Sequence, residues 1–234
     1  MAAANVTPMV QQYMAVKQEH QNELLFFRLG DFYEMFFDDA LVASKELEIT
    51  LTGKNCGQEE RAPMCGIPYH AADSYLTKLV NKGYKVAICE QVEDPKLAKG
   101  IVKREVIRIV TPGTNLNMMS LEESRNNYLM CIAYTEDKIG IAVVDALTGD
   151  FYVTEVSDTK KLNDEIVKFS PSEIICNDNF LVSGYSIDDL RERLGISINK
   201  IDAWHFEEDS CQKLLCKHFK VNTLTALGVD DFMA

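Results

Sequence analysis

Long hydrophobic runs are absent from this sequence of 234 residues. No apolar stretch approaches the roughly 18 residues that a membrane-spanning helix needs. The opening residues, Met1 to Asn5, also lack the charged and apolar regions of a secretory signal. We therefore expect a soluble protein of the cytoplasm that has no membrane partner.

Paired cysteine motifs are missing as well. The seven cysteines are odd in number, and none of them forms a Cys-x-x-Cys pair. Reduced and mostly buried thiols are the simplest expectation for such a pattern. A zinc site built from Cys56, Cys65 and His70 is an alternative, but the spacing matches no familiar zinc site. We predict neither a metal nor a cofactor for this chain.

Motifs for catalysis are also lacking. Gly53-Lys54 has neither the following Ser or Thr nor the earlier Gly of a Walker A phosphate-binding loop. The four histidines have no evident catalytic partner in the sequence. We therefore predict that this chain has no catalytic residues and is not an enzyme.

Positive charge is scarce, and the excess of acidic over basic residues differs between the two halves of the chain. The chain has 24 Lys and Arg against 36 Asp and Glu, a net charge of −12. Residues 1–118 hold 13 basic and 15 acidic residues (net −2), and residues 119–234 hold 11 and 21 (net −10). Only the first half is therefore suited to a nucleic-acid surface, and a solvated basic edge is the alternative. Between positions 96 and 108 a single acid, Glu105, accompanies five basic residues: Lys96, Lys99, Lys103, Arg104 and Arg108.

Helical and strand-like patterns alternate in the first half. This mixture predicts an α/β domain that ends near Asn117. A polar loop is expected over 53–61, and residues 63–70 are expected to be extended. Hydrophobic periodicity predicts helices over 8–21, 38–47 and 71–81, and strands over 24–29, 49–52, 85–90 and 104–110.

A different order of elements follows a linker predicted over 118–127. Three closely spaced strands (128–134, 139–145, 151–156) precede a helix (159–169), a strand (173–176), a helix (186–194), a strand (197–202) and a helix (207–218). The order βββαβαβα is that of the ribonuclease H-like fold. Nucleases of this fold need several carboxylates around two Mg²⁺ ions, for which the chain offers Asp145, Asp150 and Glu173. A metal nuclease is nevertheless the weakest interpretation, because a fold alone does not define a function.

The run Gly30-Asp31-Phe32-Tyr33-Glu34-Met35-Phe36 joins a strand-like segment to a helix-like one. In an extended run, Phe32 and Glu34 point to one side and Tyr33 points to the other. Six aromatic residues lie between Phe26 and Phe37, and such clusters usually fill a core. The core interpretation therefore stands beside a second one, in which an aromatic and a carboxylate share an exposed edge.

Five runs follow one another along the chain: Thr7-Pro8-Met9 with Gln12-Tyr13, Gly30–Phe37, Met64–Ala71, Val86–Gln91 and Arg108–Thr114. They resemble, in the same order, the mismatch-recognition domain of the MutS family of bacterial DNA mismatch-repair proteins. The second half is similar to the connector domain of that family, which is ribonuclease H-like. The resemblance implies a mixed-sheet α/β mismatch-recognition domain over 1–117 and a ribonuclease H-like α/β connector domain over 128–234.

The resemblance implies a role for seven residues. Phe32 would enter the minor groove and stack on a mispaired base, and Glu34 would hydrogen-bond that base. Lys54, Arg104 and Arg108 are the expected phosphate contacts, although the family often has a basic pair where this chain has Lys54-Asn55. Met64 and Pro68 would line the groove beside Phe32, the residue that acts as the wedge.

Proteins of the family are longer than this chain. They continue into lever, clamp and ATPase domains, so the resemblance implies an N-terminal fragment whose ATP and Mg²⁺ belong to a domain outside it. The expected partners are mismatched double-stranded DNA and, through the connector domain, a MutL-type protein. The whole protein is expected to be a homodimer and the fragment a monomer. A module devoted to protein partners is the alternative, because a net charge of −10 in the second half suits a basic protein surface.

Overall fold

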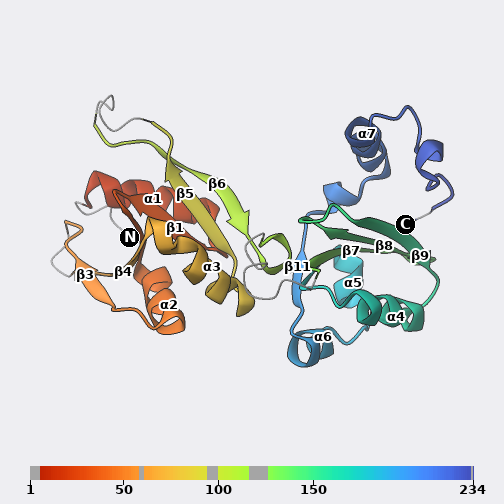
Figure 1. Ribbon diagram of the computed structural model, residues 1–234, viewed down its shortest axis with the longest axis horizontal. Coiled ribbons are helices and arrows are strands. Elements are labelled where there is room, and N and C mark those ends of the chain that lie inside the picture. Colours follow the sequence, from red (N-terminus) through yellow and green to blue (C-terminus); the bar gives the residue numbers. More distant parts are fainter. Residues whose placement is uncertain (1–5, 58–60, 94–99, 116–125, 233) are drawn as a thin grey trace. The chain divides into compact units, whose positions relative to one another are not determined.

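The computed structural model describes residues 6–57, 61–93, 100–115, 126–232 and 234. The chain divides into two compact units, residues 1–118 and 119–234 (Figure 1). Both units combine helices with a mixed sheet, as the sequence predicted. Of the predicted linker 118–127, residues 118–125 lie outside the described part of the chain.

The first unit contains a six-stranded sheet with the order β3-β4-β2-β1-β5-β6. Strands β1 and β5 are parallel, and the other neighbours pair antiparallel. Strand β2 is therefore central, between β1 and β4. The strands are β1 (Leu24–Leu29), β2 (Phe32–Phe36), β3 (Thr52–Lys54), β4 (Ala62–Pro68), β5 (Val86–Gln91) and β6 (Arg104–Val110), and the helices are α1 (Pro8–Glu19), α2 (Phe37–Leu47) and α3 (Ala72–Asn81).

Helices cover the two faces of this sheet unequally. Helices α2 and α3 pack on one face, where Phe26, Tyr33 and Ile67 are buried. Helix α1 lies on the opposite face (Figure 1), where Tyr13 packs against Phe27 and other buried residues of the sheet. A single helix covers less of a six-stranded sheet than two helices do, so part of the α1 face stays open.

The predicted strand over 49–52 is displaced toward the C-terminus. Helix α2 ends at Leu47, its C-cap Glu48 takes a left-handed conformation (φ 57°), and the Ile49 N–H still bonds the Ser44 carbonyl. The backbone can pair with β4 only after this turn, so β3 begins at Thr52 and includes Lys54. Helix α1 similarly ends at Glu19, two residues before the predicted end.

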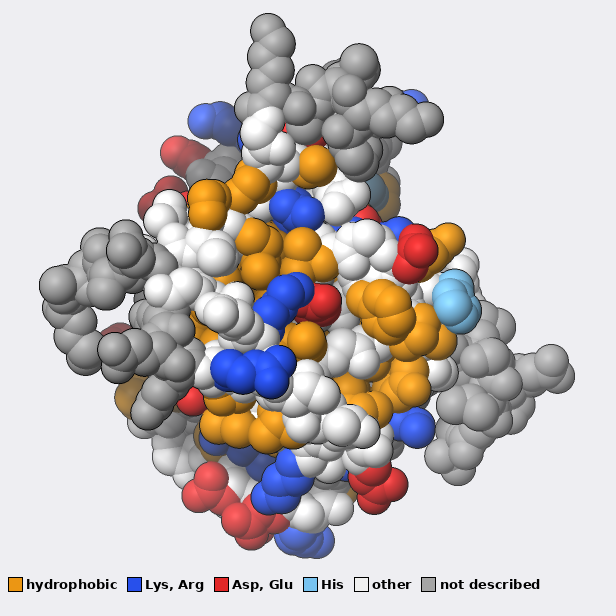
Figure 2. Space-filling model, turned by 90° about the vertical axis from the view of Figure 1, so that its left-hand side faces the viewer, with side chains coloured by type: hydrophobic (Ala, Val, Ile, Leu, Met, Phe, Trp, Pro, Cys, Tyr) orange, Lys and Arg blue, Asp and Glu red, His pale blue; other side chains and the backbone are white. Residues whose placement is uncertain are grey.

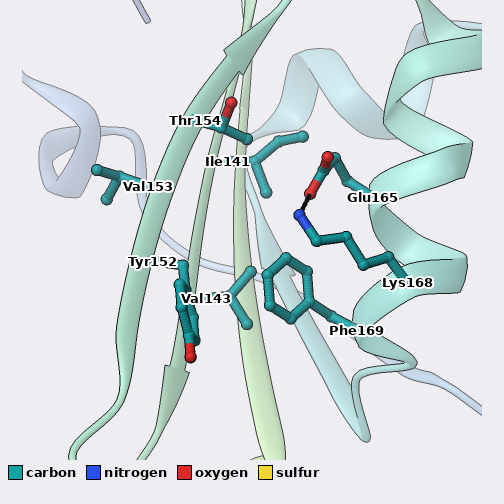
Figure 3. A pocket seen from close by; sticks show the side chains of 8 residues that line it. All are labelled: Ile141, Val143, Tyr152, Val153, Thr154, Glu165, Lys168 and Phe169. Carbon is teal, nitrogen blue, oxygen red and sulfur yellow. Dashed lines mark hydrogen bonds and ion pairs between the residues drawn. The ribbon is translucent and has the colours of Figure 1, made fainter.

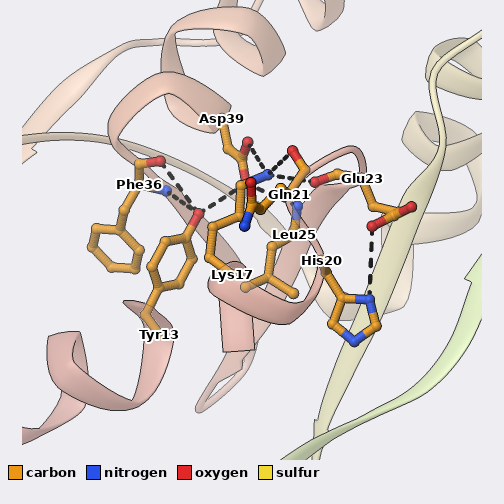
Figure 4. Close-up of polar contacts among 8 residues, drawn as sticks. All are labelled: Tyr13, Lys17, His20, Gln21, Glu23, Leu25, Phe36 and Asp39. Carbon is orange, nitrogen blue, oxygen red and sulfur yellow. Dashed lines mark hydrogen bonds and ion pairs between the residues drawn. The ribbon is translucent and has the colours of Figure 1, made fainter. Parts of the chain in front are cut away.

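A buried carboxylate, Asp39, ties α1 to the junction of β2 and α2 (Figure 4). Its oxygens accept from Lys17 Nζ (2.9 Å), the Tyr13 hydroxyl (3.0 Å) and the Leu25 N–H (3.0 Å). The Tyr13 hydroxyl also accepts the Phe36 N–H at 3.3 Å. Because a buried charge is costly unless it is paired, these contacts stabilise one arrangement of the junction. They fix the end of the strand that begins at Phe32.

The second unit has the sheet order β11-β10-β7-β8-β9. Strand β10 is parallel to β7 and β11, whereas β7, β8 and β9 form an antiparallel meander. Helices α4, α5 and α6 lie on one face and α7 lies on the other (Figure 1), so the ribonuclease H-like prediction is confirmed. The elements are β7 (Tyr128–Tyr134), β8 (Ile139–Asp145), β9 (Phe151–Val156), α4 (Thr159–Phe169), β10 (Glu173–Cys176), α5 (Asp178–Val182), α6 (Ile187–Leu194), β11 (Ser197–Lys200) and α7 (Glu208–Phe219).

Helix α5 is the element that the sequence pattern missed. It spans five residues, and the Asn177 side chain caps it by accepting the Phe180 N–H. Phe180 is fully buried under the sheet. One turn of helix is too short to show a hydrophobic period, so capping chemistry was its only signal in the sequence.

Asp145 of β8 serves the backbone. One of its oxygens accepts the Leu147 N–H at 2.9 Å, and the other accepts the Asn127 N–H at 3.2 Å. The first bond holds the turn between β8 and β9, and the second ties the residue before β7 to the end of β8. Across the described residues, no three His, Cys, Asp or Glu side chains gather as a metal site would require. None of the helices in the described ranges is long and apolar enough to cross a membrane.

Candidate nucleic-acid interface

A tight hairpin presents Phe32 at the start of β2. Gly30 turns the chain with a left-handed φ of 59°, a conformation that costs glycine little. The Phe32 side chain is 47% exposed, whereas Tyr33 is 7% exposed. The predicted alternation is therefore confirmed. Of the six clustered aromatic residues, Phe26, Phe27, Tyr33 and Phe36 are buried and Phe37 is partly buried, so the core interpretation applies to every member except Phe32.

Glu34 lies on the same side of β2 as Phe32, opposite Gly66 of β4. A Cβ built on Gly66 would stand 3.5 Å from Glu34 Cγ, so the bare backbone leaves room for the carboxylate. Lys54 reaches across from β3, and its Nζ forms an ion pair with Glu34 Oε2. The same ammonium lies 5.5 Å from the centre of the Phe36 ring. The structure thus pairs Lys54, the expected phosphate contact, with Glu34, the expected base contact.

Five residues make up what we call the Phe32–Lys54 patch: Phe32, Glu34, Lys54, Gly66 and Pro68. Directly paired residues of neighbouring strands share a face, and here Phe32 pairs with Pro68 and Glu34 with Gly66. The patch occupies the α1 face of the sheet. Figure 2 views the side of the first unit that lies at the left of Figure 1, toward β3 and β4, where hydrophobic and basic side chains lie side by side and most acidic side chains lie toward the margins.

Met64 lies beside the patch and is only partly exposed. It pairs with Phe36, packs against the core beneath α1, and its carbonyl accepts the Thr52 hydroxyl at 3.0 Å. Met64 therefore supports the patch from below more than it lines the surface. Pro68, by contrast, pairs directly with Phe32 at the end of β4.

Arg104 is buried and committed to the fold. Its guanidinium donates to the Arg28 carbonyl (2.6 Å), to Gln12 Oε1 (2.9 Å) and to the Val102 carbonyl (2.8 Å). It also lies 5.2 Å from the centre of the Phe27 ring, and burial lowers the pKa of the guanidinium. These bonds fasten α1 and β6 to the end of β1. The geometry argues against the phosphate role expected for Arg104.

Arg108 is exposed but stands on the other face of the sheet. It pairs with Ile88, whose side chain belongs to the core beneath α2 and α3. Simple alternation along β6 would place Arg104 and Arg108 on one face. The register shifts between Ile88 and Cys89, so Ile107 is an extra, bulged residue and the two arginines face opposite ways. The structure does not bring Arg108 to the Phe32–Lys54 patch.

Arg28 and Tyr69 brace the hairpin from the opposite face. Arg28 Nε donates to the Gly30 carbonyl at 2.6 Å, and its guanidinium stacks on the Tyr69 ring at 3.8 Å. The Tyr69 N–H donates to the Asp31 carbonyl at 2.9 Å. Both residues of the turn before Phe32 are thereby held. The sequence pattern did not indicate this brace, because the contact between Arg28 and Tyr69 depends on which strands pair.

Tyr33 and Glu90 complete the support beneath the hairpin. The Tyr33 hydroxyl donates to Glu90 Oε1, which also lies 3.7 Å from Arg28 Nη1. Burial, and next the hydrogen bond to Glu90, raise the pKa of Tyr33 to about 12. A neutral tyrosine and two paired charges therefore stabilise the strand that carries Phe32 and Glu34.

The patch is suited to binding. An exposed aromatic ring can stack on a base, and a carboxylate can accept hydrogen bonds from donors on the edge of that base. Pro68 pairs with Phe32 and Gly66 with Glu34, so no bulky or charged side chain of β4 stands directly opposite either residue. The arrangement offers contact and hydrogen bonding to a base.

The second unit has a small pocket between its meander and α4 (Figure 3). Its volume is about 250 Å³, and Ile141 and Val143 form an apolar floor. The ring centres of Tyr152 and Phe169 stand 5.3 Å apart, and Lys168 pairs with Glu165 at 2.9 Å on the helix side. Such a pocket matches a single apolar side chain with a polar neighbour.

Two family models match the chain: MutS domain I over residues 7–118 and MutS domain II over residues 127–233. A DNA mismatch repair protein MutS from Lachnoclostridium phytofermentans is 62% identical over 98% of this chain and 25% of its own length. The MutS proteins of Acetivibrio thermocellus (54% identical over 93% of this chain and 25% of theirs) and Ruminiclostridium cellulolyticum (53%, 96% and 26%) are also similar.

The chain therefore spans about a quarter of the length of the curated relatives that it matches. The two matched segments fall one in each compact unit and together leave little of the sequence outside. The mixed sheet of the first unit and the ribonuclease H-like second unit agree with the two domains named by those matches. This chain belongs to the MutS family.

Proposed function

We propose that the first unit recognises mispaired or unpaired bases in duplex DNA, as a part of DNA mismatch repair. Phe32 is inserted into the minor groove and stacks on the displaced base, and Glu34 hydrogen-bonds that base. The single observation that carries this proposal is the exposure of Phe32 within an otherwise buried aromatic cluster, with Glu34 on the same side of the strand. Pro68 borders the Phe32 ring, and Met64 supports the patch from below.

The energetics of unstacking give such a site its selectivity. Inserting an apolar wedge between base steps costs a few kcal/mol, and a mismatched or unpaired base costs least. An aromatic ring accepts any base, since every base has a π-face. A carboxylate in the groove adds repulsion from phosphates that only a bonded, displaced base offsets. Matched duplex therefore binds more weakly for two reasons: the higher cost of unstacking and the repulsion between the carboxylate and the phosphates.

Titration of this chain with a short duplex that carries one unpaired thymine, beside its matched twin, tests the proposal at low salt. We expect tighter binding to the unpaired base, and we expect Phe32→Ala to abolish that preference. The loss should be at least about fivefold, because stacking on one base contributes about 1–3 kcal/mol. Phe151→Ala is the matched control, since Phe151 is 46% exposed but lies in the second unit.

Two outcomes would contradict the proposal. One is equal affinity of the unchanged chain for both duplexes, which would reduce the first unit to a basic surface. The other is a mismatch preference that survives Phe32→Ala, which would place recognition elsewhere. A preference that also falls in Phe151→Ala would show that the loss is not specific to the wedge.

We further propose that the second unit contacts a MutL-type protein. The acidic balance of residues 119–234 (11 basic and 21 acidic residues) favours a basic partner surface, and the pocket at Tyr152 and Phe169 offers an anchor point (Figure 3). ATP hydrolysis, with its Mg²⁺, and assembly into a homodimer are proposed for the parts of the relatives that lie beyond this chain, which covers about a quarter of them.

A further inference from the structure

The ion pair between Lys54 and Glu34 gives Lys54 a task beyond phosphate binding. The two side chains come from different strands, β3 and β2, and are 34% and 17% exposed. Partial burial makes their attraction stronger than that of a fully exposed pair, because less water screens it. Lys54 is therefore held by Glu34 before any DNA arrives.

The geometry leaves Glu34 able to act while it stays paired. Lys54 engages Oε2, and an ionised carboxylate has about four acceptor positions over its two oxygens. Gly66 beneath and the Phe36 ring near the ammonium limit where the pair can lie. A base that donates to Glu34 therefore meets a carboxylate whose position is already set.

We propose that Lys54 is the positioning residue for Glu34. It holds the carboxylate in the orientation that a displaced base requires. This inference rests on the proposed function of the Phe32–Lys54 patch. Lys54 then determines mismatch specificity through Glu34, and contributes little as an independent phosphate contact.

A double-mutant cycle separates these two roles. Binding to the unpaired-thymine duplex and to its matched twin is measured for the unchanged chain, Lys54→Gln, Glu34→Gln and the double variant. We expect Lys54→Gln to reduce the ratio of the two affinities by about threefold to tenfold when Glu34 is present, a typical coupling for residues in contact. In the Glu34→Gln background, the same change should alter the ratio by less than about twofold.

Two further variants serve as controls. Lys54→Arg keeps a cation that can pair with the carboxylate, so it should retain most of the mismatch preference. Lys82→Gln breaks another lysine–glutamate pair, between Lys82 and Glu46 at 2.9 Å, on the α2–α3 face of the same unit. It should leave the affinity ratio unchanged. Thermal unfolding of each variant verifies that the fold persists.

Each outcome has a distinct meaning. Lys54→Gln could lower the affinity for both duplexes by the same factor and reduce the salt dependence of binding by about one phosphate contact. If it does so both with and without the Glu34→Gln change, Lys54 is a plain phosphate ligand and the inference is overturned. A change in the ratio that is equally large in the Glu34→Gln background also overturns it. If the unchanged chain shows no mismatch preference, the proposed function fails, and this inference fails with it.

Discussion

Gly66 matters because it has no side chain. It stands opposite Glu34, and an added Cβ would contact Glu34 Cγ at 3.5 Å and the Tyr33 carbonyl at 3.4 Å. Those are ordinary van der Waals distances, so one methyl group fits, and we expect the further methyl groups of a branched side chain to meet Glu34. Space for the carboxylate is therefore a property of residue 66.

Substitutions at Gly66 should separate stability from recognition. Gly66→Ala is expected to unfold at the same denaturant concentration or slightly higher, because alanine in a strand gains up to about 1 kcal/mol over glycine. Gly66→Val is expected to displace Glu34 and to reduce the mismatch preference, with stability nearly retained. Urea unfolding and the two-duplex titration measure the two effects. An undiminished preference in Gly66→Val would contradict the role of this gap.

The hairpin of β1 and β2 depends on contacts from outside itself. Arg28 holds the Gly30 carbonyl and stacks on Tyr69, and the Tyr69 N–H holds the Asp31 carbonyl. The position of Phe32 is thus set by β1 and by Tyr69, the residue that follows β4, together. A loose hairpin would place the Phe32 ring less accurately, since an exposed ring makes few contacts of its own.

Arg28→Lys tests this brace. Lysine lacks the planar guanidinium that stacks on Tyr69 while it bonds the Gly30 carbonyl, so the turn should open more often. We expect faster amide hydrogen exchange at Asp31 and Phe32, with exchange in β10 and β11 of the second unit unaffected. Arg108→Lys is the control, because Arg108 is an exposed residue on another strand of the same sheet. Equal exchange rates at the turn in both variants would refute the brace.

Local periodicity predicted most elements of the molecule, and long-range register decided the rest. The two-residue period of a strand was enough to place Phe32 and Glu34 on one side of β2. Strand β3 shifted because it must pair with β4, and Arg104 turned inward because a bulge at Ile107 reverses the alternation of β6. The ion pair of Lys54 and Glu34 joins residues twenty positions apart. No local pattern contains such a contact.

Four cysteine thiols make the stability of both units depend on pH in the alkaline range. Burial raises the pKa of Cys65 to about 11 and that of Cys89 to about 12 in the first unit, and the pKa values of Cys176 and Cys131 to about 11 and about 12 in the second. An unfolded thiol loses its proton near pH 8.5, whereas these folded thiols keep theirs. Unfolding therefore releases protons above that pH, so rising pH favours the unfolded chain.

We expect the unfolding temperature to be steady up to about pH 8.5 and to fall steeply between there and about pH 11, where the folded thiols begin to ionise. Circular dichroism melts across this range, in a reducing buffer, measure the effect. Cys89→Ala should lower the starting stability but flatten the fall, since it removes one group that must stay protonated in the fold. A slope that is identical in the unchanged chain and in Cys89→Ala would mean that the Cys89 thiol does not govern alkaline unfolding.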